Sequence, residues 1–339
     1  MTLTEHRDYY RPFSYPWAFE YYHQQQQMHW LPNEIPLAED ISDWKFKLTK
    51  GEKNLVTQIL RFFTQGDIDI ARGYIERYMQ YFKAPEVRMM LCSFANTEAI
   101  HTHAYSHLLD TLGLPEAEYQ AFHEYKEMEN KHEYLFKKHV EQEIEVASQG
   151  GTGPFTKIPI YDSLKNIVLD LCKFSAFGEG LQLFSSFVIL MNFQRFGKLK
   201  GLGQIITWSV RDESLHCEAM IKLFNTLIDE NKFIWKSDFK QLIYQTCRDM
   251  VDLEDKFIDL AFEMGDIDGL TKDDVKQYVR YLADRRLLQL KLKPNFKVKK
   301  NPLSWFDDML LGNEHGNFFE TKVTEYSKGI NRGDWADAF

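Results

Sequence analysis

The sequence has few cysteines, few prolines and no apolar run long enough to cross a membrane. Its four cysteines are widely spaced and form no Cys-x-x-Cys pair, which is typical of reduced thiols in a cytosolic protein. The longest apolar run, near 184–193, falls short of the roughly 18 residues that a membrane span needs. The first ten residues lack the apolar stretch of a signal peptide. We therefore expect a soluble, cytoplasmic protein with no membrane contact.

The sequence also lacks an excess of basic residues. It has 41 Lys and Arg against 50 Asp and Glu, a formal net charge of −9, and a nucleic-acid surface needs a basic footprint. The one basic stretch, 285–300, is interpreted as a solvated helix end with its linker. Hydrophobic residues make up 44% of the chain and aromatic residues 15%, which is enough for a sizeable core.

From about Lys50 onward, apolar residues recur with the 3.6-residue period of helices, which predicts an all-α fold. Ala84-Pro85 and Gly113-Leu114-Pro115 mark breaks between helices. The helices are predicted near 50–82, 86–112, 116–147, 160–196, 200–229, 236–265 and 271–291.

The two ends differ from this helical region. The first 45 residues are rich in aromatic residues and include the run Gln24–Gln27, and from about Gly312 onward the sequence is polar and has no helical stripe. We expect 1–45 to be an N-terminal segment that wraps the bundle, 46–311 to be the helical domain, and 312–339 to be a mobile tail.

Glu-x-x-His occurs four times, and the i, i+3 spacing places both side chains on one helix face. Two copies, Glu98–His101 and Glu213–His216, lie on apolar faces, where an unpaired charge is costly. The apolar neighbours are Leu91, Phe94, Tyr105 and Leu108 for the first pair, and Ile206, Met220, Leu223 and Leu227 for the second. Of the other two copies, Glu129–His132 lies in a charge-dense stretch typical of a solvated surface. Glu20–His23 has no partner carboxylate helix.

Two further carboxylates also lie on apolar helix faces. Asp67 shares a stripe with Phe63, whereas Asp69 faces away from it. Glu179 is the only charged residue between positions 173 and 195. A lone carboxylate in such a helix is normally neutralised or paired, and a metal ion can supply the pairing.

These residues form a set of six metal-ligand candidates on four helices. Oxygen-activating dinuclear sites use carboxylates to bridge and charge-balance two divalent ions, and imidazoles to complete each ion. Helical bundles build such sites from one carboxylate on each of two helices and a Glu-x-x-His pair on each of two others. The predicted ligands are Asp67, Glu98, His101, Glu179, Glu213 and His216. The alternative is four unrelated buried carboxylates, each held by its own hydrogen bond.

At these positions the sequence resembles the small (beta) subunit family of class I ribonucleotide reductase, nearly from end to end. The matching features are Asp67, the segment EAIHTHAY at 98–105, Glu179 and the segment RDESLH at 211–216. The resemblance implies a ferritin-like helical bundle with additional helices around a buried dimetal site, usually as a homodimer. It also implies oxygen activation that oxidises a nearby tyrosine, matched by Tyr105, to a stable tyrosyl radical.

The resemblance further implies that the radical is passed to a large (alpha) subunit, which reduces ribonucleotides to deoxyribonucleotides. Trp30 matches a tryptophan of the transfer route, and Asp212 matches the carboxylate that links it to the histidine matched by His101. Tyr326 matches the relay tyrosine. The C-terminal residues 334–339 resemble the peptide that docks on the large subunit.

Two positions depart from the family pattern. Ser209 lies on the site face where many members have an apolar residue, so its hydroxyl is expected to bond a ligand, Tyr105 or water. Leu183 replaces an aromatic residue of some members. The ligand set accommodates two iron ions per chain, which we expect, and also manganese or a mixed pair. If manganese is used, a separate flavoprotein activator is a further candidate partner.

Two other functions remain open at this point. A stand-alone dimetal oxidase that acts on a small hydrophobic ligand would need an apolar channel, but would have no use for Trp30, Tyr326 or a docking tail. An iron-storage bundle would need a short shell-forming subunit, which 339 residues with a mobile tail do not suit.

Overall fold

The computed structural model describes residues 2–137 and 160–310, and it confirms the all-α prediction. The only β-pairing in these residues is an isolated bridge between Ile267 and Leu270. The α-helices are α1 (Pro16–Gln27), α2 (Ala38–Phe46), α3 (Lys50–Arg72), α4 (Met79–Tyr81), α5 (Pro85–Leu112), α6 (Lys126–His132), α8 (Ile160–Leu171), α9 (Phe184–Arg195), α10 (Lys200–Glu230), α11 (Ser237–Ala261) and α12 (Lys272–Gln289). Within 2–137 and 160–310, the π-helical segments are η2 (Gly73–Tyr78), η5 (Glu133–Lys137) and η6 (Cys172–Leu183). Short 3₁₀ turns are η1 (Pro32–Glu34), η3 (Glu116–Tyr119), η4 (Ala121–Glu124) and η7 (Lys232–Ile234).

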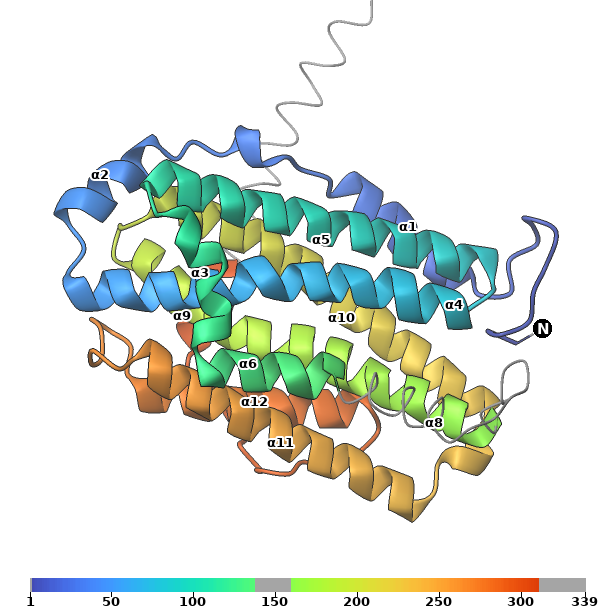
Figure 1. Cartoon of the computed structure of the whole chain (residues 1–339). Coiled ribbons are helices and arrows are strands. Elements are labelled where there is room, and N and C mark those ends of the chain that lie inside the picture. The colour runs from blue at the N-terminus through green and yellow to red at the C-terminus, as the bar shows by residue number, and fades with distance from the viewer. Residues whose placement is uncertain (1, 138–159, 311–339) are drawn as a thin grey trace, which may run out of the picture.

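Four long helical segments form the centre of the bundle. They are α3, α5, α10 and the continuous run of α8, η6 and α9. The helix α3 packs along α5, and α10 packs against both η6 and α5 (Figure 1). The helices α11 and α12 cover η6 on its other side, so the centre is enclosed by helices on several faces.

Local sequence signals account for the ends of the central helices. At the start of α3, the Thr49 hydroxyl accepts a hydrogen bond from the Glu52 backbone N–H, and the Glu52 carboxylate accepts one from the Thr49 N–H. The helix α5 begins at Pro85, which has no N–H to leave unpaired there. It ends at Gly113, whose φ of 73° lies in the left-handed region that favours glycine.

The start of α10 is fixed by the N-terminal part of the chain. The buried Asp40 carboxylate on α2 accepts hydrogen bonds from the backbone N–H groups of Gly201 (2.9 Å) and Leu202 (2.7 Å). Asp43 accepts another from the Leu199 N–H at 2.9 Å. A carboxylate at a helix N-terminus satisfies free N–H groups and complements the helix dipole. These contacts hold in place the helix that carries Glu213 and His216.

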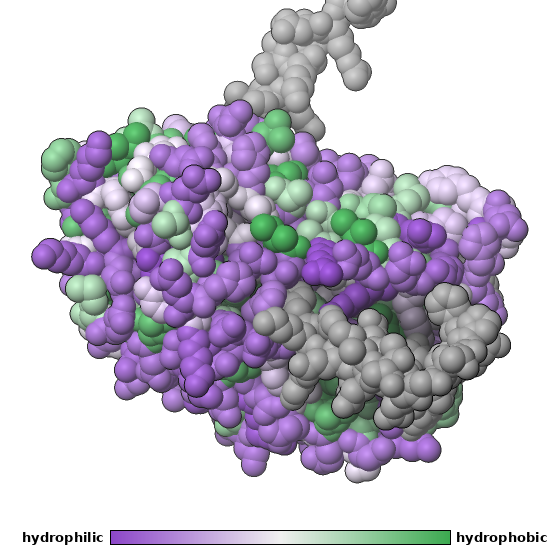
Figure 2. Space-filling view, viewed as in Figure 1, coloured by the Kyte–Doolittle hydropathy of each residue, from purple (hydrophilic) through white to green (hydrophobic). Residues whose placement is uncertain are grey.

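The expectation that no segment is long and apolar enough to cross a membrane was wrong by length and composition, because Leu164–Arg195 meets both conditions. Its most apolar stretch is nevertheless wholly buried in the bundle. Its apolar character therefore serves the core. The face drawn in Figure 2 is mostly hydrophilic, and its apolar side chains are scattered.

The prediction of one helix over 116–147 was wrong in its first part. The chain forms the turns η3 and η4 before α6 begins at Lys126. The side chain of Tyr119 is bonded back to Ser106 on α5 at 2.9 Å, and Glu118 forms an ion pair with Arg61 on α3. These contacts hold the segment across the bundle instead of along a new helix axis. Residues 138–147 and the predicted loop at 148–154 lie outside the described residues.

Candidate metal centre

The structure brings all six predicted ligands together in the middle of the bundle, and all six are buried. They form two groups whose ligand atoms lie within 4.8 Å of one another. One group is Asp67, Glu98 and His101, and the other is Glu98, Glu179, Glu213 and His216. Because Glu98 belongs to both groups, it would be a shared ligand if each group held an ion.

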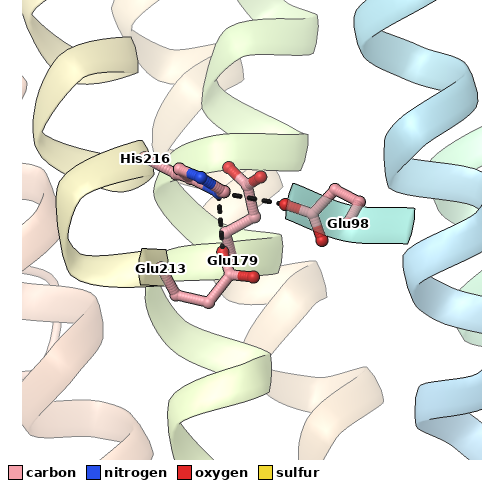
Figure 3. Close-up of side chains that lie close together, drawn as sticks. All are labelled: Glu98, Glu179, Glu213 and His216. Atoms are coloured by element: carbon pink, nitrogen blue, oxygen red, sulfur yellow. Dashed lines mark ion pairs between the residues drawn. The ribbon is translucent and has the colours of Figure 1, made fainter. Parts of the chain in front are cut away.

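The second group converges from three helical segments, as Figure 3 shows. The His216 Nδ1 atom lies 3.0 Å from Glu98 Oε1 and 3.5 Å from Glu213 Oε2. In the group of Asp67, Glu98 and His101, the His101 Nδ1 atom lies 3.4 Å from Glu98 Oε2. It also lies 3.2 Å from Glu213 Oε1 of the other group. Both imidazoles thus present the same nitrogen, Nδ1, to the carboxylates, and Glu213 also reaches both groups.

The π-helical segment η6 positions Glu179. The neighbouring Gly180 has no room for a side chain, because a Cβ there would lie 2.6 Å from both Arg286 Nε and Cys217 Sγ. Arg286 Nε donates a hydrogen bond to the Gly180 carbonyl at 2.8 Å. π-Helical geometry within longer helices is rare overall but is frequent at functional sites. Here the glycine allows η6 to approach α10 and α12 closely.

Several buried oxygen and nitrogen atoms of this cluster have no hydrogen-bond partner. Buried polar atoms in native proteins are almost always paired, so a concentration of unpaired ones needs a physical reason. A cation coordinated by these atoms provides one, and carboxylate oxygens with imidazole nitrogens suit iron or manganese. The residues therefore fit a pair of divalent ions. The atoms that make no hydrogen bond are Asp67 Oδ2, both oxygens of Glu98, Glu179 Oε2, both oxygens of Glu213 and His216 Nδ1. Of these, the atoms of Glu98, Glu213 and His216 take part only in the histidine–carboxylate ion pairs described above.

The carboxylates show the electrostatic cost of this arrangement. Burial raises the pKa of Asp67 well above its usual range, and the nearby Glu98 carboxylate adds to the effect. Burial and the charges of Glu213 and Glu98 raise the pKa of Glu179 to about 8. Burial also acts to raise the pKa of Glu213, but close contacts with the two histidines outweigh it and lower the value to about 2.

The neighbouring carboxylates keep both histidines protonated, because they raise the pKa of each imidazole. Burial alone would lower the pKa of His216, but its contacts with Glu213 and Glu98 raise it to about 10. Burial acts in the same direction on His101, and contacts with Asp212, Glu213 and Glu98 raise its pKa well above the usual range. Protons on these imidazoles supply positive charge that bound cations would otherwise supply.

Behind His101 lies a hydrogen-bonded chain that includes two predicted residues. Asp212 Oδ2 lies 3.3 Å from His101 Nε2 and accepts a hydrogen bond from the Trp30 indole N–H at 2.7 Å. All three side chains are buried. Carboxylates in this position orient ligand imidazoles and fix their tautomer. The structure thus links the buried indole of Trp30 to the cluster through one carboxylate.

Gln25 is a site residue that the sequence analysis missed. Its side-chain oxygen lies 3.1 Å from His216 Nε2, and its amide nitrogen lies 3.4 Å from Asp212 Oδ1. Gln25 therefore contacts one ligand directly and the other through Asp212. A four-glutamine run usually indicates solvent exposure. Only the burial of Gln25 among exposed neighbours distinguishes it.

Tyr105 lies beside the first group on α5 and is 1% exposed. Its hydroxyl donates a hydrogen bond to Ser209 Oγ at 3.1 Å, and its ring packs against Phe63 with centroids 4.9 Å apart. Burial, reinforced by the nearby Asp67, raises the pKa of Tyr105 well above its usual range. The phenol is therefore protonated, and the partner of the Ser209 hydroxyl is Tyr105 instead of a ligand.

The other two Glu-x-x-His copies do not join the cluster. Glu20 and His23 are exposed on α1. His132 instead lies 2.7 Å from Asp69, the acid that faces away from the site. Tyr326 and the predicted docking tail lie outside the described residues.

Comparison with known proteins identifies related sequences over most of the chain. The family model described as "Ribonucleotide reductase, small chain" matches residues 7–302. A probable ribonucleoside-diphosphate reductase small subunit of Invertebrate iridescent virus 3 is 45% identical over 98% of this chain and 88% of its own length. The ribonucleoside-diphosphate reductase subunit beta of Chlamydia pneumoniae is 31% identical over 94% of this chain and 90% of its own.

Solved structures share the fold. A ribonucleotide reductase R2 subunit from Clostridium botulinum superposes with a TM-score of 0.76 and 24% identity, covering 88% of this chain and 89% of that one. A dimanganese(II) protein, NrdF, of Streptococcus sanguinis superposes with a TM-score of 0.68 and 20% identity, covering 87% and 97%. These likenesses support the ferritin-like bundle.

The protonation of the cluster predicts that metal binding depends on pH. Ligands bind cations only when deprotonated, whereas at pH 7 the metal-free cluster holds protons on His216 and Glu179. Metal uptake should therefore release protons, and apparent affinity should fall about tenfold per pH unit for each proton released as pH falls from 8 to 6. Anaerobic calorimetry with Mn²⁺ at several pH values and an indicator assay would measure both quantities. Uptake without proton release, at an affinity independent of pH, would contradict this electrostatic description.

Proposed function

The chain belongs to the ribonucleotide reductase small-chain family, and on this basis we propose how its buried cluster serves the enzyme. It is the small (beta) subunit of a reductase that converts ribonucleotides to deoxyribonucleotides. Small subunits of this family work with a large subunit and are typically dimeric. The names of the relatives support ribonucleoside diphosphates as substrates. We propose that the reaction takes place in the cytoplasm.

Small subunits of this family hold a dimetal centre. We propose that one ion is held by Asp67, Glu98 and His101, and the other by the group that includes Glu179 and His216. Iron is the expected ion, with manganese or a mixed pair as alternatives, because carboxylates and imidazoles accommodate all of them. A flavoprotein activator would accompany manganese. When bound, the ions would supply the chemistry that activates oxygen, and oxygen is the oxidant that accepts the electron and proton from the tyrosine.

Tyr105 is the proposed radical residue. Its oxidation removes one electron and the hydroxyl proton, because a buried phenol with a raised pKa does not ionise beforehand. The dry surroundings, with the ring packed on Phe63, limit the access of water and reductants to the resulting tyrosyl radical. Ser209 provides the hydroxyl nearest to the phenol oxygen, so it is placed to hydrogen-bond the radical.

The chain of Trp30, Asp212 and His101 is the proposed route away from the cluster. The indole and imidazole rings lie 6.0 Å apart between centroids, and Asp212 accepts hydrogen bonds from one and contacts the other. The Asp212 carboxylate holds the indole and imidazole rings in fixed positions, so neither ring has to move for an electron to pass between them. We propose that Tyr326 continues the route and that the tail at 312–339 docks on the large subunit.

A stand-alone dimetal oxidase is not favoured as an alternative. The relatives are ribonucleotide reductase small subunits over nearly the whole chain. The observation that carries the radical-transfer proposal is the Trp30–Asp212 hydrogen bond at 2.7 Å. An oxidase that acts by itself has no need for this bond.

Replacement of Tyr105 by Phe tests the radical residue. The variant should bind the same amount of metal as the wild type, because Tyr105 hydrogen-bonds Ser209 and no ligand. It should lack the stable tyrosyl radical and the reductase activity with the large subunit. Electron paramagnetic resonance after reconstitution with ferrous iron and oxygen, with metal quantified on the same sample, measures both properties. A stable tyrosyl signal of wild-type intensity in Tyr105→Phe would show that the radical lies elsewhere.

Removal of the residues from 312 onward tests the role of the tail. The truncated chain should load metal and form the radical normally, since the cluster lies within the described bundle. Its activity with the large subunit should be lost, and the full-length protein should compete for the large subunit where the truncated one does not. Full activity of the truncated protein would refute the docking role.

A further inference from the structure

A second buried tyrosine contacts the cluster at Glu179, which belongs to the group that does not include Asp67 and His101. The Tyr74 hydroxyl donates a hydrogen bond to Glu179 Oε1 at 2.6 Å. Tyr74 is 1% exposed, and burial with the neighbouring Glu179 charge raises its pKa well above the usual range, so the phenol remains a donor. The other carboxylate oxygen, Glu179 Oε2, has no hydrogen-bond partner. The two oxygens of Glu179 are thus in different chemical situations.

The fold holds this pair firmly. Tyr74 lies in η2, directly after the helix that carries Asp67, and Glu179 lies in η6, so π-helical segments supply both partners. The Tyr74 ring packs edge-on against Phe94 and His216, with centroids 5.9 and 6.2 Å away. The two ring contacts and the hydrogen bond to Glu179 fix the phenol, so it can hold the carboxylate in one orientation.

We propose that Tyr74 is a positioning residue that orients Glu179, so that Oε2 alone faces the second ion position while Oε1 stays bound to the phenol. The inference rests on the proposed two-ion site and adds that the two ion positions depend on different residues. Glu179 belongs only to the group with Glu213 and His216, and not to the group of Asp67 and His101. Tyr74 therefore controls one ion position and leaves the other unaffected.

Without the phenol, Glu179 would lose this orientation. The Glu179 carboxylate would then rotate freely, and ion binding would have to restrict that rotation. The buried Oε1 atom would also be left without a hydrogen-bond donor. Loss of a hydrogen-bond partner behind a ligand typically weakens metal binding about 10–100-fold. Tyr74→Phe should show this loss for the second ion only.

A titration of the full-length, metal-free protein with Mn²⁺ tests the inference without any enzyme assay. Electron paramagnetic resonance distinguishes an isolated Mn²⁺ ion, with six lines, from a coupled pair. The wild type should form the coupled pair as two ions are added. Tyr74→Phe should bind the first ion as the wild type does and the second about 10–100-fold more weakly, so six-line spectra should persist past one equivalent.

Tyr78→Phe is the matched control. Tyr78 lies in the same π-helical segment, is 2% exposed, and packs on Tyr74 with centroids 5.7 Å apart. Its hydroxyl donates a hydrogen bond to the Asp170 backbone carbonyl at 3.3 Å, and its other hydrogen-bond partner is Ser175, which is not a predicted ligand. This variant loses a comparable buried hydroxyl but should bind both ions normally. If Tyr74→Phe does not fold, 4-fluorophenylalanine at position 74 fills the space of the hydroxyl without donating a hydrogen bond, and the same titration applies.

The titrations of the wild type and the two variants decide between the positioning role of Tyr74 and its absence. Selective loss of the second ion in Tyr74→Phe, with both ions retained in Tyr78→Phe, supports the positioning role. Equal affinities for both ions in Tyr74→Phe and in the wild type overturn it. A wild-type protein that never forms a coupled pair overturns the two-ion site itself, which is a separate failure.

Discussion

The constraint on which the rest of the structure depends is the burial of four carboxylates in one cluster. Asp67, Glu98, Glu179 and Glu213 come from four helical segments and lie where water cannot screen them. Such a cluster is tolerable only with compensating positive charge, from protons or from cations. Specific tertiary contacts hold this cluster in place. The α2 carboxylates anchor α10, and a glycine in η6 permits the close approach of the helices.

The cluster is not symmetrical, and its asymmetry relates structure to function. On one side, Tyr105 is bonded to the neutral hydroxyl of Ser209, and His101 is tied through Asp212 to Trp30. On the other side, Glu179 is held by a second phenol. In the proposed function, the first side serves the oxidation of a tyrosine and the transfer of an electron, and in the proposed role of Tyr74 the second side orients a ligand. Glu98 belongs to both.

The sequence predicted much of this site because a charge on an apolar helix face is a local signal. The pairs Glu98–His101 and Glu213–His216 are detectable from their spacing together with the apolar helix faces on which they lie, and Glu179 is detectable as the one charge in an apolar helix. The contacts of Gln25 and Tyr74 are not detectable in this way. They depend on how separate helices approach one another, and Gln25 lies in a run whose composition suggests a solvated surface. The turns at 116–124 were mispredicted for the same reason, since tertiary contacts determine their path.

The central claim is that these buried carboxylates and imidazoles hold two ions. Crystals of the full chain soaked with Mn²⁺ and measured at wavelengths on both sides of the manganese absorption edge would test it most directly. The account predicts two anomalous peaks per chain, about 3.5–4 Å apart as in other two-metal sites, with Glu98 between them. A single peak, or peaks only on the protein surface, would contradict it.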